Sequence, residues 1–167
     1  MRITKAELYN KYYSASRNLY LGDTEMPNHC HNRVTVYSAN THDVAKIKQM
    51  FEDESTFGQI IPEPDWPNTP NKNGELPVKH EDPWLTYRWS DGSQDDRWYD
   101  WRNQNWDTKW DAYDVVVTDD DPECTEIEFN TAWAPPEPIC RALRELFPDV
   151  SISWFYDEPG CELAGYL

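Results

Sequence analysis

Three side chains in the segment NWDTKWD combine groups that proton transfer needs. Thr108, Lys109 and Asp111 lie within four positions of one another. An amine beside a carboxylate can pass a proton to and from a substrate, so the segment is a candidate enzymatic or ligand-binding site. The sequence offers no nucleophile, base and orienting group at a recognisable spacing, and no Gly-rich phosphate loop. No catalytic residue is therefore assigned, and ion pairing of Lys109 with neighbouring aspartates is the simpler interpretation.

Tryptophans around this segment suggest a second chemistry. Residues 95–111 hold four of the nine tryptophans, interleaved with aspartates and asparagines. Such rings can stack on a sugar while carboxylates accept hydrogen bonds from its hydroxyls. Alternatively, the rings can pack in the protein interior with their N–H groups hydrogen-bonded. Packing of Trp106, Trp110 and Trp133 over a sheet is the competing interpretation. The alternative ligand site comprises Asn105, Trp106, Thr108, Lys109, Asp111 and Trp133.

Acidic residues dominate the composition. The chain carries 31 acidic and 15 basic residues, a net charge of −16. Residues 81–128 hold fifteen acids and four bases, a net −11, whereas residues 1–50 are slightly basic at +3. The negative electrostatic potential that results repels nucleic acid and anionic membranes and favours basic partners. The competing interpretation is that most of these acids are solvated loop residues without a binding role. The candidate partner-binding surface is an anionic row with tryptophan anchors: Asp91, Asp95, Asp96, Asp100, Asp119, Asp120, Asp121 and Glu123, with Trp84, Trp98 and Trp101.

Cysteine and histidine give no pattern of a metal site or a disulfide framework. The four cysteines lack any short paired spacing. His29, Cys30 and His31 adjoin one another, but neighbouring strand residues point to opposite faces, and no second ligand pair has zinc-like spacing. No apolar segment approaches the roughly 18 residues that a membrane span needs. We expect a reduced, cytoplasmic protein without metal or cofactor.

The elements that must position these groups alternate between strands and helices. Period-two patterns predict strands at residues 32–38, 113–117, 125–133, 150–156 and 162–166. Helical spacing predicts helices at residues 42–54 and 135–147, the first capped by Thr41. The patterns place Trp133 and Leu146 among the inward-facing residues. This order is that of an α+β, ferredoxin-like split βαβ fold, with helices on one face of an antiparallel sheet.

Two segments fall outside that frame. Residues 4–20 predict a Tyr-rich helix, so residues 1–25 form a helical extension and residues 26–167 the ferredoxin-like domain. Residues from about 55 to 112 form a Pro- and Trp-rich insertion, in which the prolines prevent a long helix. Because the helices cover one face of the sheet, we expect the insertion to cover the other.

Several motifs resemble those of the YubB-type ferredoxin-like proteins of phages and conjugative plasmids. The segment MPNHCHNRVTV is similar to the family's MPNxCxNxLxV, NWDTKWD to NWGTKWD, FNTAWAPP to FxTAWSPP, and YDEPG with Ala164-Gly165 to YxEPGxxFAG. The likeness spans residues 26–165. Asp107 stands where the family has Gly, which adds charge and removes an easy positive φ. The resemblance implies a ferredoxin-like fold and an accessory role on mobile DNA.

The charge and the resemblance together predict a non-enzymatic accessory protein in the cytoplasm of a bacterial host, as a monomer or homodimer. It would bind and inhibit or modulate a host nucleic-acid-binding protein, such as a defence or recombination enzyme, through a DNA-mimicking acidic face. Direct binding of nucleic acid or membrane is not expected. The alternative is a small-ligand or sugar binder, or an enzyme, at NWDTKWD. Mimicry needs the acids on one face, whereas the alternative needs its six residues around one pocket.

Overall fold

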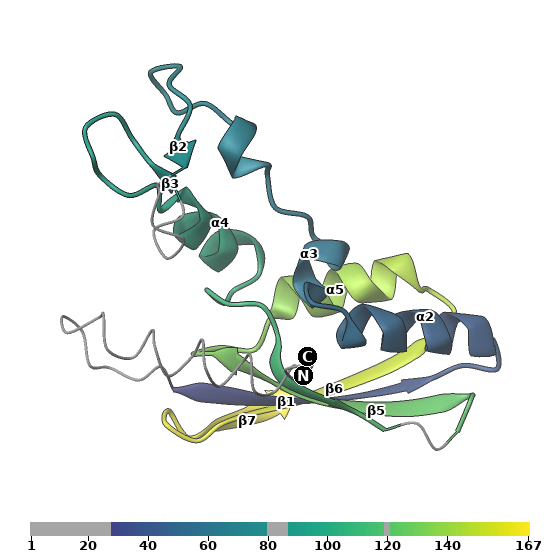
Figure 1. The fold of residues 1–167 in the computed structure, drawn as a ribbon. Helices are drawn as coiled ribbons and strands as arrows, with labels where there is room; N and C mark the ends of the chain where they lie inside the picture. Colours follow the sequence, from purple (N-terminus) through teal and green to yellow (C-terminus); the bar gives the residue numbers. More distant parts are fainter. Residues whose placement is uncertain (1–27, 80–86, 119–120) are drawn as a thin grey trace, which may run out of the picture.

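The computed structural model describes residues 28–79, 87–118 and 121–167 (Figure 1). The helix expected at residues 4–20 and the candidate residues Trp84, Asp119 and Asp120 lie outside these ranges.

A five-stranded antiparallel sheet forms the base of the described structure (Figure 1). Its strands, in spatial order, are β4 (Tyr113–Val117), β5 (Cys124–Ala132), β1 (His29–Tyr37), β6 (Ser151–Glu158) and β7 (Leu163–Tyr166). The central strand β1 pairs with β5 and β6, which sets Val34 opposite Ile127 and Trp154. The predicted ferredoxin-like α+β fold is confirmed, with β7 added beside β6.

Helices cover one face of this sheet (Figure 1). They are α2 (Thr41–Glu52), α3 (Thr56–Ile60) and α5 (Glu137–Leu146). The predicted buried stripe of α2 is confirmed, but its cap is Asn40 rather than Thr41, because the Asn40 side chain accepts from the N–H of His42. The helix α5 begins directly after Pro136, where a proline costs no intrahelical hydrogen bond.

The core lies between the helices and the inner face of the sheet, and aromatic rings fill its centre. Phe129 packs against Phe51 at 5.3 Å and against Trp154 at 5.5 Å between ring centroids. The Trp154 indole also donates to Asn32 Oδ1 at 3.0 Å, so the buried N–H is satisfied. Burying each such side chain contributes roughly 2–3 kcal/mol.

Two residues that the pattern places inside are exposed. Trp133 is 44% exposed, because β5 ends at Ala132 and Trp133 adopts a φ of 74°. The backbone N–H of Trp133 donates to the Asn28 carbonyl at 2.9 Å. The chain therefore leaves the strand before the alternation can turn the ring inward. Leu146 is 55% exposed at the end of α5, where Phe147 takes the buried position.

The insertion lies on the helix side of the sheet rather than on the opposite face (Figure 1). Beyond α3, its elements are η1 (Trp66–Asn68), β2 (Val78–Lys79), β3 (Tyr87–Arg88) and α4 (Arg97–Asn105), with β2 and β3 paired as a small second sheet. The attachment runs through Phe57, whose ring contacts both Trp106 and the core residue Phe129. The prediction that the insertion covers the outer face is therefore wrong for the described residues, none of which covers that face.

Candidate functional site

Apart from Trp110, which lines a hollow described below, the NWDTKWD segment is built into the protein. Trp106 is 1% exposed and donates its indole N–H to the Ile61 carbonyl at 3.0 Å. The buried Thr108 hydroxyl lies 3.1 Å from both the N–H and the carbonyl of Ala132, so it accepts from one and donates to the other. These bonds hold the end of the insertion against the end of β5.

Asp111 also has a structural role. Its carboxylate accepts from the Phe57 N–H at 2.8 Å, from the Ser55 hydroxyl at 3.2 Å and from the Ala112 N–H at 2.8 Å. Burial raises the pKa of this carboxyl, and the hydrogen bonds partly oppose that rise. Asp111 thus caps the first turn of α3 from a distant part of the chain.

The remaining residues of the alternative ligand site point to the same conclusion. The Lys109 ammonium lies over the Trp110 ring, 4.4 Å from its centroid, and among the described residues it forms none of the predicted ion pairs. The Asn105 amide donates to the Trp101 carbonyl at 2.8 Å. The six residues of the site line neither of the two hollows described below. Their arrangement favours packing over catalysis.

The predicted acidic row is divided in the structure. Asp95 is 5% exposed and pairs with Arg97 through both oxygens at 2.8 Å. Asp96 and Asp100 are exposed at the start of α4, and Asp91 accepts from Ser93 in a nearby turn. Asp121 and Glu123 lie at the far end of the β4–β5 hairpin, across the molecule from α4 (Figure 1). The single row is therefore corrected to two separate acidic groups.

The two described tryptophan anchors belong mainly to the insertion's own packing. Trp101 lies edge to face between Trp66 and Trp106, with centroid distances of 6.5 and 5.7 Å. Trp98 is half-buried under the Arg102 guanidinium, 5.2 Å from its ring centroid. Trp98 retains an accessible edge, whereas Trp101 mainly connects η1 to the core.

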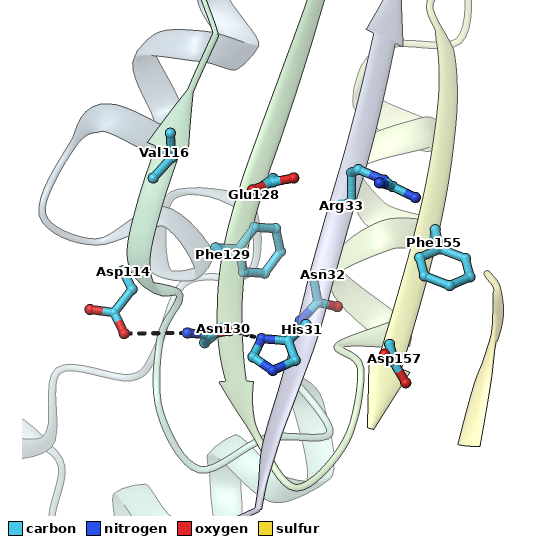
Figure 2. Close-up of a pocket in the computed structure, with 10 residues that line it drawn as sticks. All are labelled: His31, Asn32, Arg33, Asp114, Val116, Glu128, Phe129, Asn130, Phe155 and Asp157. Carbon is cyan, nitrogen blue, oxygen red and sulfur yellow. Dashed lines mark hydrogen bonds between the residues drawn. The ribbon is translucent and has the colours of Figure 1, made fainter. Parts of the chain in front are cut away.

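The open outer face of the sheet carries a shallow hollow of about 400 Å³ (Figure 2). Alternate residues of four strands point into it, because successive strand side chains take opposite faces. They include His31 and Arg33 from β1, Glu128 and Asn130 from β5, Phe155 and Asp157 from β6, and Asp114 and Val116 from β4. None of the candidate site residues predicted from the sequence lines this hollow, although its polar positions follow from the same alternation that identifies the core.

A chain of hydrogen bonds orders one side of the hollow (Figure 2). The Asn130 amide nitrogen donates to Asp114 Oδ2 at 3.3 Å, so its oxygen accepts from His31 Nδ1, 2.6 Å away. His31 Nδ1 therefore carries hydrogen, and Nε2 is the ring nitrogen left for an incoming group. Asp114 reaches over the sheet because the strand bulges between Tyr113 and Val116 and Asp114 adopts a φ of 54°.

A cation and an aromatic ring form the other side. Strand register sets Arg33 between Glu128 on β5 and Phe155 on β6. The Arg33 guanidinium lies 5.4 Å from the Phe155 ring centroid, and Phe155 packs against the exposed Tyr166 at 5.3 Å. With three acids and one arginine among its lining residues, the hollow carries a net negative charge. It can bind a basic group and give it an aromatic surface for contact.

Within the ranges that the structure describes, no group of three His, Cys, Asp or Glu side chains is arranged to hold a metal ion. No helix in those ranges is long and apolar enough to cross a membrane. His29 and His31 are exposed while Cys30 is buried, as the alternation predicts.

The fold and the site together define a ferredoxin-like domain whose sheet carries an acidic hollow on the face away from its helices. Residues 105–167 match the family model described as the ferredoxin-like domain in Api92-like protein. The crystal structure of protein Api92 from Yersinia pseudotuberculosis is similar in fold, with a TM-score of 0.50 and 11% sequence identity. The alignment covers 84% of this chain and 93% of Api92. A comparison with curated proteins gave no match. The resemblance to YubB-type proteins stays a prediction.

Proposed function

We propose that the protein is a non-enzymatic accessory protein of a phage or plasmid that binds a basic protein surface through the outer face of its sheet. The partner is a nucleic-acid-binding protein of the bacterial host, engaged in the cytoplasm. The observation that supports this most strongly is the hollow that Asp114, Glu128 and Asp157 line together with the Arg33–Phe155 pair. The partner class is the one expected from the sequence, but the binding surface is the outer face of the sheet instead of the predicted acidic row.

The charge of this face favours a protein partner over a nucleic acid. An RNA platform on a sheet pairs aromatic residues with cations that hold phosphate. Here Arg33 is the one Lys or Arg among the residues that line the hollow, against three carboxylates. A lysine or arginine side chain of a partner meets the opposite sign and is steered toward the face by the −16 charge of the chain.

The aromatic residues supply the contact energy that exposed ion pairs lack. Exposed salt bridges contribute about 0–1 kcal/mol each and weaken in salt. Phe155 and the exposed Tyr166 lie next to each other and can bury apolar area against a partner. A central aromatic contact with charges around it is a common arrangement at protein interfaces.

Capture from host lysate tests the proposal when combined with matched variants. The test variant neutralises the hollow by Asp114→Asn, Glu128→Gln and Asp157→Asn. The control variant neutralises three exposed acids elsewhere, by Glu52→Gln, Glu145→Gln and Asp149→Asn. We expect the wild type and the control to retain the same basic nucleic-acid-binding protein at low salt and to lose it at high salt, whereas the test variant does not retain it.

Competition with duplex DNA tests the mimicry within the same experiment. If the face occupies the partner's nucleic-acid site, added duplex DNA releases the partner. Retention of the partner by the test variant would show that the sheet face is not the binding surface. If the wild type and both variants retain the partner and duplex DNA does not release it, the protein binds its partner without mimicking DNA.

A further inference from the structure

We propose that the insertion carries a second, separate site that binds a neutral proline-rich peptide in the polyproline II conformation. A hollow of about 430 Å³ lies among η1, β3 and α4. Apolar and aromatic side chains provide much of its wall: Trp66, Pro67, Tyr87, Trp98 and Trp110. The volume falls in the range of small-ligand and peptide sites, roughly 300–1,000 Å³.

The charged residues that line this hollow, Glu63, Asp95 and Arg102, are already paired within the protein. Glu63 Oε1 accepts from Arg102 Nε at 2.6 Å, and Glu63 Oε2 accepts from the Trp66 indole at 3.0 Å. Both oxygens of Asp95 accept from Arg97. A ligand therefore meets no unpaired charge, which favours a neutral molecule over a basic or acidic one.

The polar groups left for a ligand are mainly donors. Among the described residues, the indole N–H groups of Trp98 and Trp110 and the Tyr87 hydroxyl have no hydrogen-bond partner, and none of them is buried away from solvent. The Gln94 amide adds a donor pair and one acceptor. The site thus offers more donors than acceptors.

This imbalance favours a proline-rich chain over a sugar. Each proline presents a carbonyl acceptor and has no N–H, so such a chain needs donors only. Each sugar hydroxyl is both donor and acceptor and would need acceptors that Glu63 and Asp95 have already committed. Proline rings pack well on indoles, and the polyproline II helix binds with little loss of entropy because it is preformed.

Nuclear magnetic resonance of the indole N–H groups in the full-length protein tests this directly. The probe is an oligoproline peptide of about ten residues, compared with a Gly/Ser peptide of equal length and with cellohexaose. We expect oligoproline to shift the resonances of Trp98 and Trp110. The Trp154 resonance should stay in place, because that indole is buried and donates to Asn32. The two control ligands should leave all three resonances unchanged.

Variants that replace the indole with the smaller phenyl ring remove its N–H and part of its packing surface, and they show whether these tryptophans bind. Trp98→Phe and Trp110→Phe should each weaken oligoproline binding by at least about three- to tenfold, the effect expected from the lost neutral hydrogen bond alone. Trp133→Phe, an exposed ring outside the hollow, should leave binding unchanged. Absence of any shift up to about 2 mM peptide, equal binding of the Gly/Ser peptide, or binding of cellohexaose alone would each overturn the proposal.

Discussion

The NWDTKWD segment and the outer face of the sheet contrast in what their polar residues do. In the segment, Trp106, Thr108 and Asp111 all bond to other parts of the chain and fasten the insertion to the core. On the outer face, Glu128 and Asp157 stand on regular strands and point to solvent in a hollow. The tryptophan-rich motif therefore marks the junction between the insertion and the core. The outward-facing positions of the strands, which form no motif, provide the surface that another molecule can reach.

Removing the Trp106 ring should have the largest effect on stability. Trp106→Ala leaves a cavity between Phe57 and Trp101 and an unpaired Ile61 carbonyl, so we expect a loss of about 3–5 kcal/mol in the free energy of unfolding. Urea denaturation followed by circular dichroism measures it. Trp133→Ala is the matched control and should cost less than about 1 kcal/mol, because that ring is exposed. Equal losses in both variants would contradict a structural role specific to the segment.

Asp111→Ala should have the next largest effect. The substitution leaves the Phe57 and Ala112 N–H groups and the Ser55 hydroxyl without their acceptor, at a cost of about 1–3 kcal/mol. Asp111→Asn keeps one acceptor oxygen and should cost less. Asp107→Asn serves as control and should change stability by less than about 0.5 kcal/mol, since Asp107 is exposed and Asn tolerates its φ of 59°. A stable Asp111→Ala variant with altered ligand binding would restore the alternative site.

Thiol labelling compares the buried core with an exposed turn and needs no substitution. Cys30 lies on the inner face, where burial raises its pKa to about 11, and burial likewise raises the pKa of Cys140. Both thiols stay protonated near neutral pH and should resist a thiol reagent in the native protein. Cys161 is exposed in the turn before β7 and should react first, as peptide mass spectrometry can show. Early labelling of Cys30 would mean that the inner face opens readily.

The sequence predicts the fold well where the signal is local. Alternation identifies β1, β4, β5 and β6, and helical spacing identifies the buried stripe of α2, because one face of each element must be apolar. The same rule fails at Trp133, where a positive φ ends the strand one residue early. The motif there, FNTAWAPP, gives no local sign of that turn.

The candidate site is harder to predict because it depends on contacts between distant residues. The position of the insertion is decided by Phe57 meeting Trp106, 49 positions along the chain. Asp95 and Asp96 are chemically identical in the sequence, yet Asp95 is buried against Arg97 while Asp96 is exposed. Charge composition therefore predicts an acidic protein and a basic partner, but it does not predict which carboxylates share a surface.

Carboxyl footprinting of the protein with and without its captured partner tests the central claim most directly. Carbodiimide labels accessible carboxylates, and mass spectrometry reports the labelling rate of each. The account predicts that the partner slows labelling of Asp114, Glu128 and Asp157 on the outer face and leaves Glu145 and Asp149 unchanged. Protection of Asp96 and Asp100 on α4, with the outer face labelled as fast as in the free protein, would contradict it.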